Sequence, residues 1–158
     1  MNIFCTSSCP TQSALWLDDV RKNKMILESA QLLSNAVRYN DPTFTGHLYK
    51  LTHNSHPCSR WARSSKSNFK WLLDHLKALC EQWGQHKTAL LVPTFEEFYG
   101  TGHFKSLDPT PFVNCTASFK HEPDTHLAYR LQMNEKWNND TIKLSWKRGE
   151  VPPWKDSL

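Results

Sequence analysis

Apolar side chains recur at helical spacing between Ser13 and about Arg38, and this pattern predicts a long helix, with Thr11 or Ser13 as its cap. The apolar surface is broad. It combines one row (Ile26, Ala30, Leu33, Val37) with a neighbouring row (Met25, Ser29, Leu32, Ala36). A helix that is apolar on most sides expects neighbours on most sides, so this segment should lie inside the fold.

A narrow polar row runs along the same predicted helix, and it consists of Arg21, Lys24, Glu28, Gln31 and Asn35. Because successive members are three or four residues apart, all five side chains point to one side. Such a row is either the water face of the helix or the lining of a cleft. The sequence alone leaves both interpretations open.

The clearest amphipathic helix is predicted from Lys66 to Trp83, with Gly84 as the residue that ends it. Shorter helices are predicted at four further places. One begins at Pro57 with Ser55 or His56 as cap, one covers His86 to Leu91 and stops at Pro93, and one covers Asp124 to Trp137. A fourth begins after Thr94, which would cap it, with Glu97 at the capping-box position.

The remaining segments lack a helical pattern. Asn2 to Thr6 is a short extended-looking apolar run, Gly100 to Pro123 is predicted to be a long loop, and the tail from Trp146 to Leu158 can dock an indole on the body. The sequence therefore predicts a mainly α protein. We expect a single compact helical domain over 1–158, with long loops and a short N-terminal extended segment.

Charge changes this picture in one segment. The 158-residue chain carries a formal charge of +4, and the part from Arg60 to Lys87 has six basic and two acidic residues. Such an excess of positive charge is typical of proteins that bind a phosphate-bearing partner, either a nucleic acid or a nucleotide. An ordinary solvated helix face has the same composition.

Five cysteines form no regular framework, and no segment resembles a secretory signal or a membrane span. The chain is therefore expected to be cytoplasmic with reduced thiols and without a membrane partner, and its oligomeric state stays open. Cys5 and Cys9 together with His53 and His56 have zinc-like spacing, but no glycine-bearing knuckle accompanies them. Neither a metal nor another cofactor is predicted.

The densest group of chemically capable residues lies between Leu51 and Arg63. Arg60 and Arg63 present forked donors that suit phosphate, next to a helix start whose free amides also attract anions. His53 and His56 could position a substrate or carry protons near neutral pH. The segment has no carboxylate, so Glu28 is the predicted general acid or base.

Further candidates complete this predicted site. Arg21, Lys24 and Asn68 would help to hold the substrate or its phosphate. Trp61 and Trp71 would stack on a base, with ordinary core packing as the alternative. No Walker-type glycine loop, dinucleotide fingerprint or G-x-S-x-G motif is present, which argues against an ordinary ATP- or NAD-dependent enzyme.

Several short stretches resemble a group of small bacteriophage proteins. They are Met1–Phe4, Ser13–Ala14, Leu17–Asp19, Arg21, Lys24–Met25, Glu28, Ala30–Leu33, His53–Pro57, Trp61–Arg63, Asn68, Trp71–Leu72, His75, His86–Lys87, Thr110–Phe112, Ala128–Arg130 and Pro153–Trp154. More distantly, the layout is similar to the pyrimidine-dimer DNA glycosylases. Those small, basic, all-α enzymes attack the damaged nucleotide's sugar with their N-terminal amine, assisted by a helix glutamate.

This resemblance implies that Glu28 and Arg21 take the places of the glycosylase glutamate and arginine. Met1 followed by Asn2 is not normally removed, so the resemblance leaves the nucleophile open. The sequence favours a phage-type enzyme acting on a nucleotide or nucleic-acid base, glycosylase-like or base-modifying. The alternative is a non-catalytic module that binds a nucleotide or a host factor during infection; a virion or host-interaction protein with a Trp-rich interface is a third reading.

Overall fold

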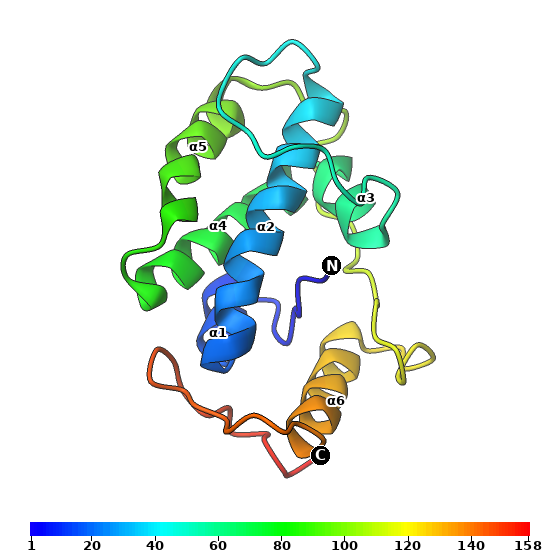
Figure 1. The fold of residues 1–158 in the computed structure, drawn as a ribbon. Coiled ribbons are helices and arrows are strands. Elements are labelled where there is room, and N and C mark those ends of the chain that lie inside the picture. Colours follow the sequence, from blue (N-terminus) through cyan, green and yellow to red (C-terminus); the bar gives the residue numbers. More distant parts are fainter.

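The computed structural model describes all residues 1–158, and it confirms a mainly α, single compact domain without strands. Six α-helices and one 3-10 helix follow one another along the chain (Figure 1). They are α1 (Pro10–Leu15), α2 (Asp19–Asn40), α3 (Pro57–Ser64), α4 (Lys66–Trp83), η1 (Lys87–Leu91), α5 (Val92–Thr101) and α6 (Thr125–Asn138).

Helix α2 is the central element. It packs against α3 and α4, and α4 in turn packs against α1 and α5. The apolar stripe predicted from the sequence is fully buried: Ile26, Ala30, Leu33 and Val37 have no exposed surface. The prediction that this helix lies inside the fold is therefore confirmed.

The prediction of one continuous helix from Ser13 is wrong, because the chain breaks between Leu15 and Asp19. The Asp18 carboxylate accepts hydrogen bonds from the amides of Val20 and Arg21, and this cap starts α2 as a separate helix. Neither Thr11 nor Ser13 caps α1. That short helix begins at Pro10, which suits the first turn because it has no amide hydrogen to satisfy.

The other helix boundaries that were predicted correctly are those with clear capping residues. Helix α3 begins at Pro57 with the His56 imidazole as cap, and α4 begins after Ser65 and ends at Gly84, which has a φ of 87°. The boundary at Pro93 was wrong. Pro93 lies in the first turn of α5, which continues directly from η1, so Thr94 does not cap a helix.

The N-terminal segment, residues 1–9, contacts α2, α6 and α4 in turn before it enters α1, and it joins no sheet. Side chains of the helices satisfy its backbone: carbonyl oxygens of Cys5, Thr6 and Ser8 accept hydrogen bonds from His126, Arg130 and Trp71 respectively. A buried extended segment is stable only with such partners.

Helix α6 makes no extensive contact with another helix. It is held by the N-terminal segment near its first turns and by the C-terminal tail near its end (Figure 1). In the tail, the Trp154 ring stacks on Trp137 with centroids 5.4 Å apart and meets Trp16 edge-on at 5.8 Å. The predicted docking of a tail indole on the body is confirmed.

Candidate functional site

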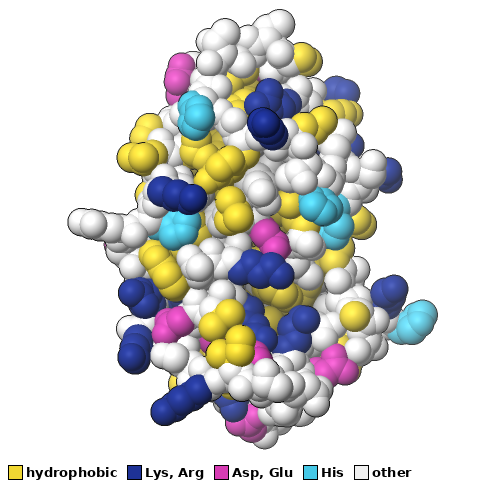
Figure 2. Space-filling view, viewed as in Figure 1, with side chains coloured by type: hydrophobic (Ala, Val, Ile, Leu, Met, Phe, Trp, Pro, Cys, Tyr) yellow, Lys and Arg dark blue, Asp and Glu magenta, His cyan; other side chains and the backbone are white.

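A pocket of about 190 Å³ lies where the N-terminal segment, α2, α6 and the long loop after α5 meet. We call it the Glu28 pocket. It is lined by Met1, Asn2, Phe4, Lys24, Met25, Glu28, Cys115, Ala117, Gln132 and Lys136. Figure 2 shows acidic and basic side chains next to one another near the middle of the face that Figure 1 presents, at the level of the N-terminus.

Glu28 is 8% exposed, and its carboxylate is flanked by two amines. Oε2 accepts a hydrogen bond from the Asn2 amide at 2.7 Å and lies 3.9 Å from the Met1 α-amine. Oε1 lies 3.7 Å from Lys24 Nζ. Buried charges are normally paired in this way, and here the pairing places a carboxylate and two amines at one pocket.

The backbone at the start of the chain is shaped to bring the Asn2 amide to Glu28. The Asn2 side-chain oxygen accepts from the amides of Ile3 and Phe4, and Phe4 adopts a positive φ of 44°. A bulky side chain rarely takes this conformation, so packing must hold it. The Phe4 ring is buried and meets Tyr129 edge-on at 6.2 Å, and this contact fixes the strained residue at the pocket wall.

The candidate side chains of the Leu51–Arg63 segment do not come together at one site in the structure. His56 lies near the Glu28 pocket: its pKa is lowered first by burial and then by the positive charges of the Met1 amine and His53, while Glu28 opposes this. His53 is exposed, has a φ of 49°, and its Nδ1 lies 2.7 Å from the Thr52 hydroxyl.

The two arginines of α3 lie apart from the Glu28 pocket. Arg63 donates to the Asn54 carbonyl at 3.2 Å and lies over the Tyr39 ring, 4.2 Å from its centroid. Arg60 is exposed on α3. Neither side chain lines the pocket.

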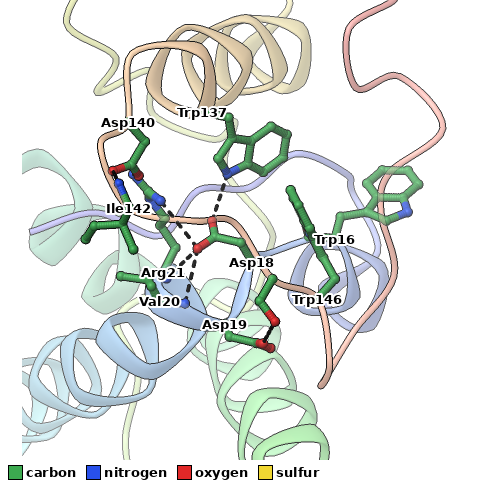
Figure 3. Close-up of polar contacts among 10 residues, drawn as sticks. Trp16, Asp18, Asp19, Val20, Arg21, Trp137, Asp140, Ile142 and Trp146 are labelled. Carbon is green, nitrogen blue, oxygen red and sulfur yellow. Dashed lines mark hydrogen bonds and ion pairs between the residues drawn. The ribbon is translucent and has the colours of Figure 1, made fainter.

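Arg21 belongs to a buried network at the start of α2 (Figure 3). Its guanidinium donates to Asp18 at 3.4 Å and also binds Asp140, while the other Asp18 oxygen accepts from the Trp137 indole at 2.8 Å. These contacts tie α2 to α6 and to the loop that follows it. Arg21 therefore supports one wall of the pocket without lining it.

Asn68, Trp61 and Trp71 lie in packed contacts between α3, α4 and the long loop. The Asn68 amide donates to the Trp61 carbonyl and to the Thr110 hydroxyl, at 2.9 and 2.6 Å. Trp61 is 4% exposed and stacks on Phe112, and the Trp71 indole donates to Ser8. None of the three lines a pocket in the structure.

The pocket residues that sequence reasoning missed include Cys115, Gln132 and Lys136. Gln132 and Lys136 are four residues apart on α6 and therefore share a face, which the sequence could have shown. Cys115 lies in an irregular loop that has no periodicity to interpret.

A second hollow of about 440 Å³ adjoins the Glu28 pocket, and Lys24 lines both. Its other residues include His86 and Lys87 from the start of η1. Three lysines, Lys136, Lys24 and Lys87, therefore line the two hollows in turn and form what we call the lysine track. A phosphate backbone is the kind of ligand that such a track favours.

Two thiols lie beside the pocket. The Cys58 thiol donates to the Cys115 sulfur across 3.6 Å, and this bond lowers the pKa of Cys115 to about 7 and raises that of Cys58. Neither cysteine is in a disulfide.

Comparison of the chain with protein-family models, with curated proteins and with solved structures gave no match. No helix has both the length and the apolar character needed to cross a bilayer.

Proposed function

We propose that the protein is a DNA glycosylase-like enzyme that acts on a nucleotide or nucleic-acid base in the Glu28 pocket. The observation that carries this proposal is the buried Glu28 carboxylate, with the Lys24 and Met1 amines 3.7 and 3.9 Å from its oxygens. An amine next to a carboxylate is the pair of groups that glycosidic-bond cleavage through an imine requires.

In this reaction the unprotonated amine attacks C1′ of the sugar and the bond from C1′ to the base breaks. Opening of the sugar ring then gives an imine between the amine and C1′. Glu28 would carry protons between the amine, the ring oxygen and the departing base. The amine is either Lys24 Nζ or, in a chain that begins with Met1, its α-amine.

Positive charge around the pocket would hold the nucleic-acid backbone. Lys24 and Lys136 line the Glu28 pocket, and Lys87 lines the adjoining hollow. His56 lies close enough to Glu28 for their charges to interact, so it would orient the substrate or relay a proton. In duplex DNA the target nucleotide must leave the stack to reach these groups.

The substitution Glu28→Gln tests this assignment. We expect it to lower base release or strand cleavage by at least about 100-fold, because that is the usual contribution of a general acid or base. Cleavage is measured on duplex oligonucleotides that carry a pyrimidine dimer, a uracil or an abasic site. Glu81→Gln, an exposed glutamate on α4, serves as the matched control and should keep the wild-type rate.

Trapping with borohydride identifies the nucleophile, because it reduces an imine to a stable cross-link between protein and DNA. A cross-linked peptide that contains Met1 or Lys24 supports the proposal. An unchanged rate in Glu28→Gln contradicts it. Binding of a nucleotide without turnover of any substrate would favour the alternative, a nucleotide- or host-factor-binding module.

A further inference from the structure

Three potential metal ligands converge beside the Glu28 pocket. They are the His56 imidazole and the Cys58 sulfur at the start of α3, and the Cys115 sulfur from the loop that precedes α6. Their ligand atoms all lie within 4.8 Å of one another. No other group of three or more His, Cys, Asp or Glu side chains in the chain meets this criterion.

The spacing of the two sulfurs fits a shared ion. They lie 3.6 Å apart, whereas a disulfide bond is about 2.05 Å long. Two thiolates bound at about 2.3 Å to a tetrahedral zinc ion are separated by about 3.8 Å. The Cys58 thiol donates to the Cys115 sulfur across this distance, and a metal ion would displace that proton.

The imidazole is also suitably placed. His56 Nδ1 accepts a hydrogen bond from the Cys58 amide at 3.2 Å, so its lone pair points toward the beginning of α3. A metal ion bound through Nε2 would leave this helix cap in place, whereas one bound through Nδ1 would replace it. Pro57 stands between the two ligands and fixes the backbone that connects them.

We propose that His56, Cys58 and Cys115 form a Zn²⁺ site on the wall of the Glu28 pocket. Two thiolates, one imidazole and a fourth position left for an oxygen ligand are typical of a zinc ion that binds or polarises a substrate. Cys115 is a lining residue of the pocket, so the fourth position would be completed there by water, by Glu28 or by a substrate oxygen. This site goes beyond the proposed function, and in it His56 binds the metal ion instead of relaying a proton.

The site differs from the set that the sequence spacing suggested. Of that set, Cys9 is exposed, and His53 is exposed with its Nδ1 next to the Thr52 hydroxyl. Neither joins His56 in a cluster. Cys58 and the loop residue Cys115 take the places of Cys5, Cys9 and His53, and only the folded chain brings Cys115 to His56.

Cobalt is the probe for this site, because Co²⁺ occupies tetrahedral zinc sites and its thiolate bonds absorb in the near ultraviolet. The full chain is titrated with Co²⁺ in the presence of a phosphine reductant, which keeps all five cysteines as thiols. We expect one Co²⁺ per chain, with thiolate-to-cobalt absorption and tetrahedral visible bands that Zn²⁺ then abolishes. Cys115→Ser and His56→Gln should each weaken binding at least tenfold, and Cys9→Ser, at an exposed thiol, should leave it unchanged.

Thermal unfolding provides a second measurement that needs no spectrum. Zn²⁺ should raise the Tm of the wild type and of Cys9→Ser, because a ligand of the folded state stabilises it. It should not raise the Tm of Cys115→Ser. This variant changes a half-buried loop residue, so its own melting curve shows whether it has folded.

Three results would overturn the proposal. The first is absence of Co²⁺ binding by the reduced, folded wild type. The second is binding that Cys115→Ser and His56→Gln leave unchanged, which would place the ion elsewhere. The third is a Cys58–Cys115 disulfide formed in air by a chain that binds no metal after reduction, which would make the two thiols a redox pair.

Discussion

At the scale of single residues, burial decides the chemistry of His75 on α4. The residue is completely buried, its Nδ1–H donates to the Pro10 carbonyl at 3.0 Å, and its Nε2 has no partner. Its ring also stacks on Trp71. Burial lowers the pKa of His75 from 6.5 to about 4, because a second proton would place a charge in this enclosed site.

This shift predicts a specific loss of stability in mild acid. Below pH 6.5 the unfolded chain binds a proton that the folded chain does not, so the free energy of unfolding should fall as the pH drops to about 4. The contribution of His75 to that loss is about 3 kcal/mol.

Urea unfolding of the wild type and of His75→Asn at a series of pH values measures this contribution. The variant keeps a donor for Pro10 but has no group that titrates in this range, so its stability should depend less on pH between 6.5 and 4. Parallel curves for the two proteins would show that His75 is not responsible.

Residue-level prediction from the sequence depended on periodicity. Lys24 and Glu28 line the same pocket because they are four apart on a helix, and that spacing was visible in the sequence. The directions in which the Arg60 and Arg63 side chains point depend on how α3 packs against α2 and α4. No local sequence pattern specifies that packing. Cys115 has no regular neighbours at all, so only the folded loop reveals its position.

At the scale of elements, caps explain most of the boundaries. Pro57, Ser65 and Gly84 are strong start and stop signals, and the helices they delimit were predicted almost to the residue. The break before Asp19 was missed because no glycine or proline marks it. The Asp18 cap is the signal that should have been given more weight.

The contribution of the Asp18 cap to stability can be measured by comparison with a second capping aspartate, Asp124. Asp18 and Asp124 each accept two amide hydrogen bonds at a helix start, but only Asp18 is fully buried and also binds Trp137 and Arg21 (Figure 3). Asp124→Ala should cost about 1 kcal/mol of stability, the usual value for a lost cap. Asp18→Ala should cost about 3 kcal/mol, because it also leaves buried donors without partners.

Chemical denaturation of the two variants and the wild type gives both values. Equal losses would mean that the bonds from Asp18 to Trp137 and Arg21 contribute nothing to stability. A larger loss in Asp18→Ala, together with an unchanged denaturant slope, is the expected result.

At the scale of the whole molecule, the pocket unites segments that are far apart in the sequence. Glu28, Met1, Cys115 and Gln132 come from four separate parts of the chain. Local patterns predicted the helices and the core, but they contain no information on which loop would cover which helix face. The sequence therefore identified only the α2 side of the pocket.

If the proposed function holds, the lysines that line the two hollows should contribute to the salt dependence of nucleic-acid binding. Each phosphate that a lysine neutralises adds about one unit to the salt dependence of log K. Lys24→Ala and Lys87→Ala should each reduce that slope by about one. Lys155, which pairs with Asp156 in the tail, provides the control variant and should leave the slope unchanged.

Fluorescence anisotropy with a labelled duplex at several salt concentrations measures these slopes. Identical slopes for all four proteins would argue against a phosphate track across the two hollows.

The attachment of α6 has a consequence for local stability. Because α6 packs mainly on irregular segments and has few contacts with other helices, such as the Trp137–Asp18 bond, we expect it to open before the packed pair of α2 and α4 does. Such partial unfolding would remove Gln132 and Lys136 from the pocket and leave Glu28 in place. A ligand that bridges Glu28 and Lys136 would therefore suppress this opening, so that its affinity and the local stability of α6 rise together.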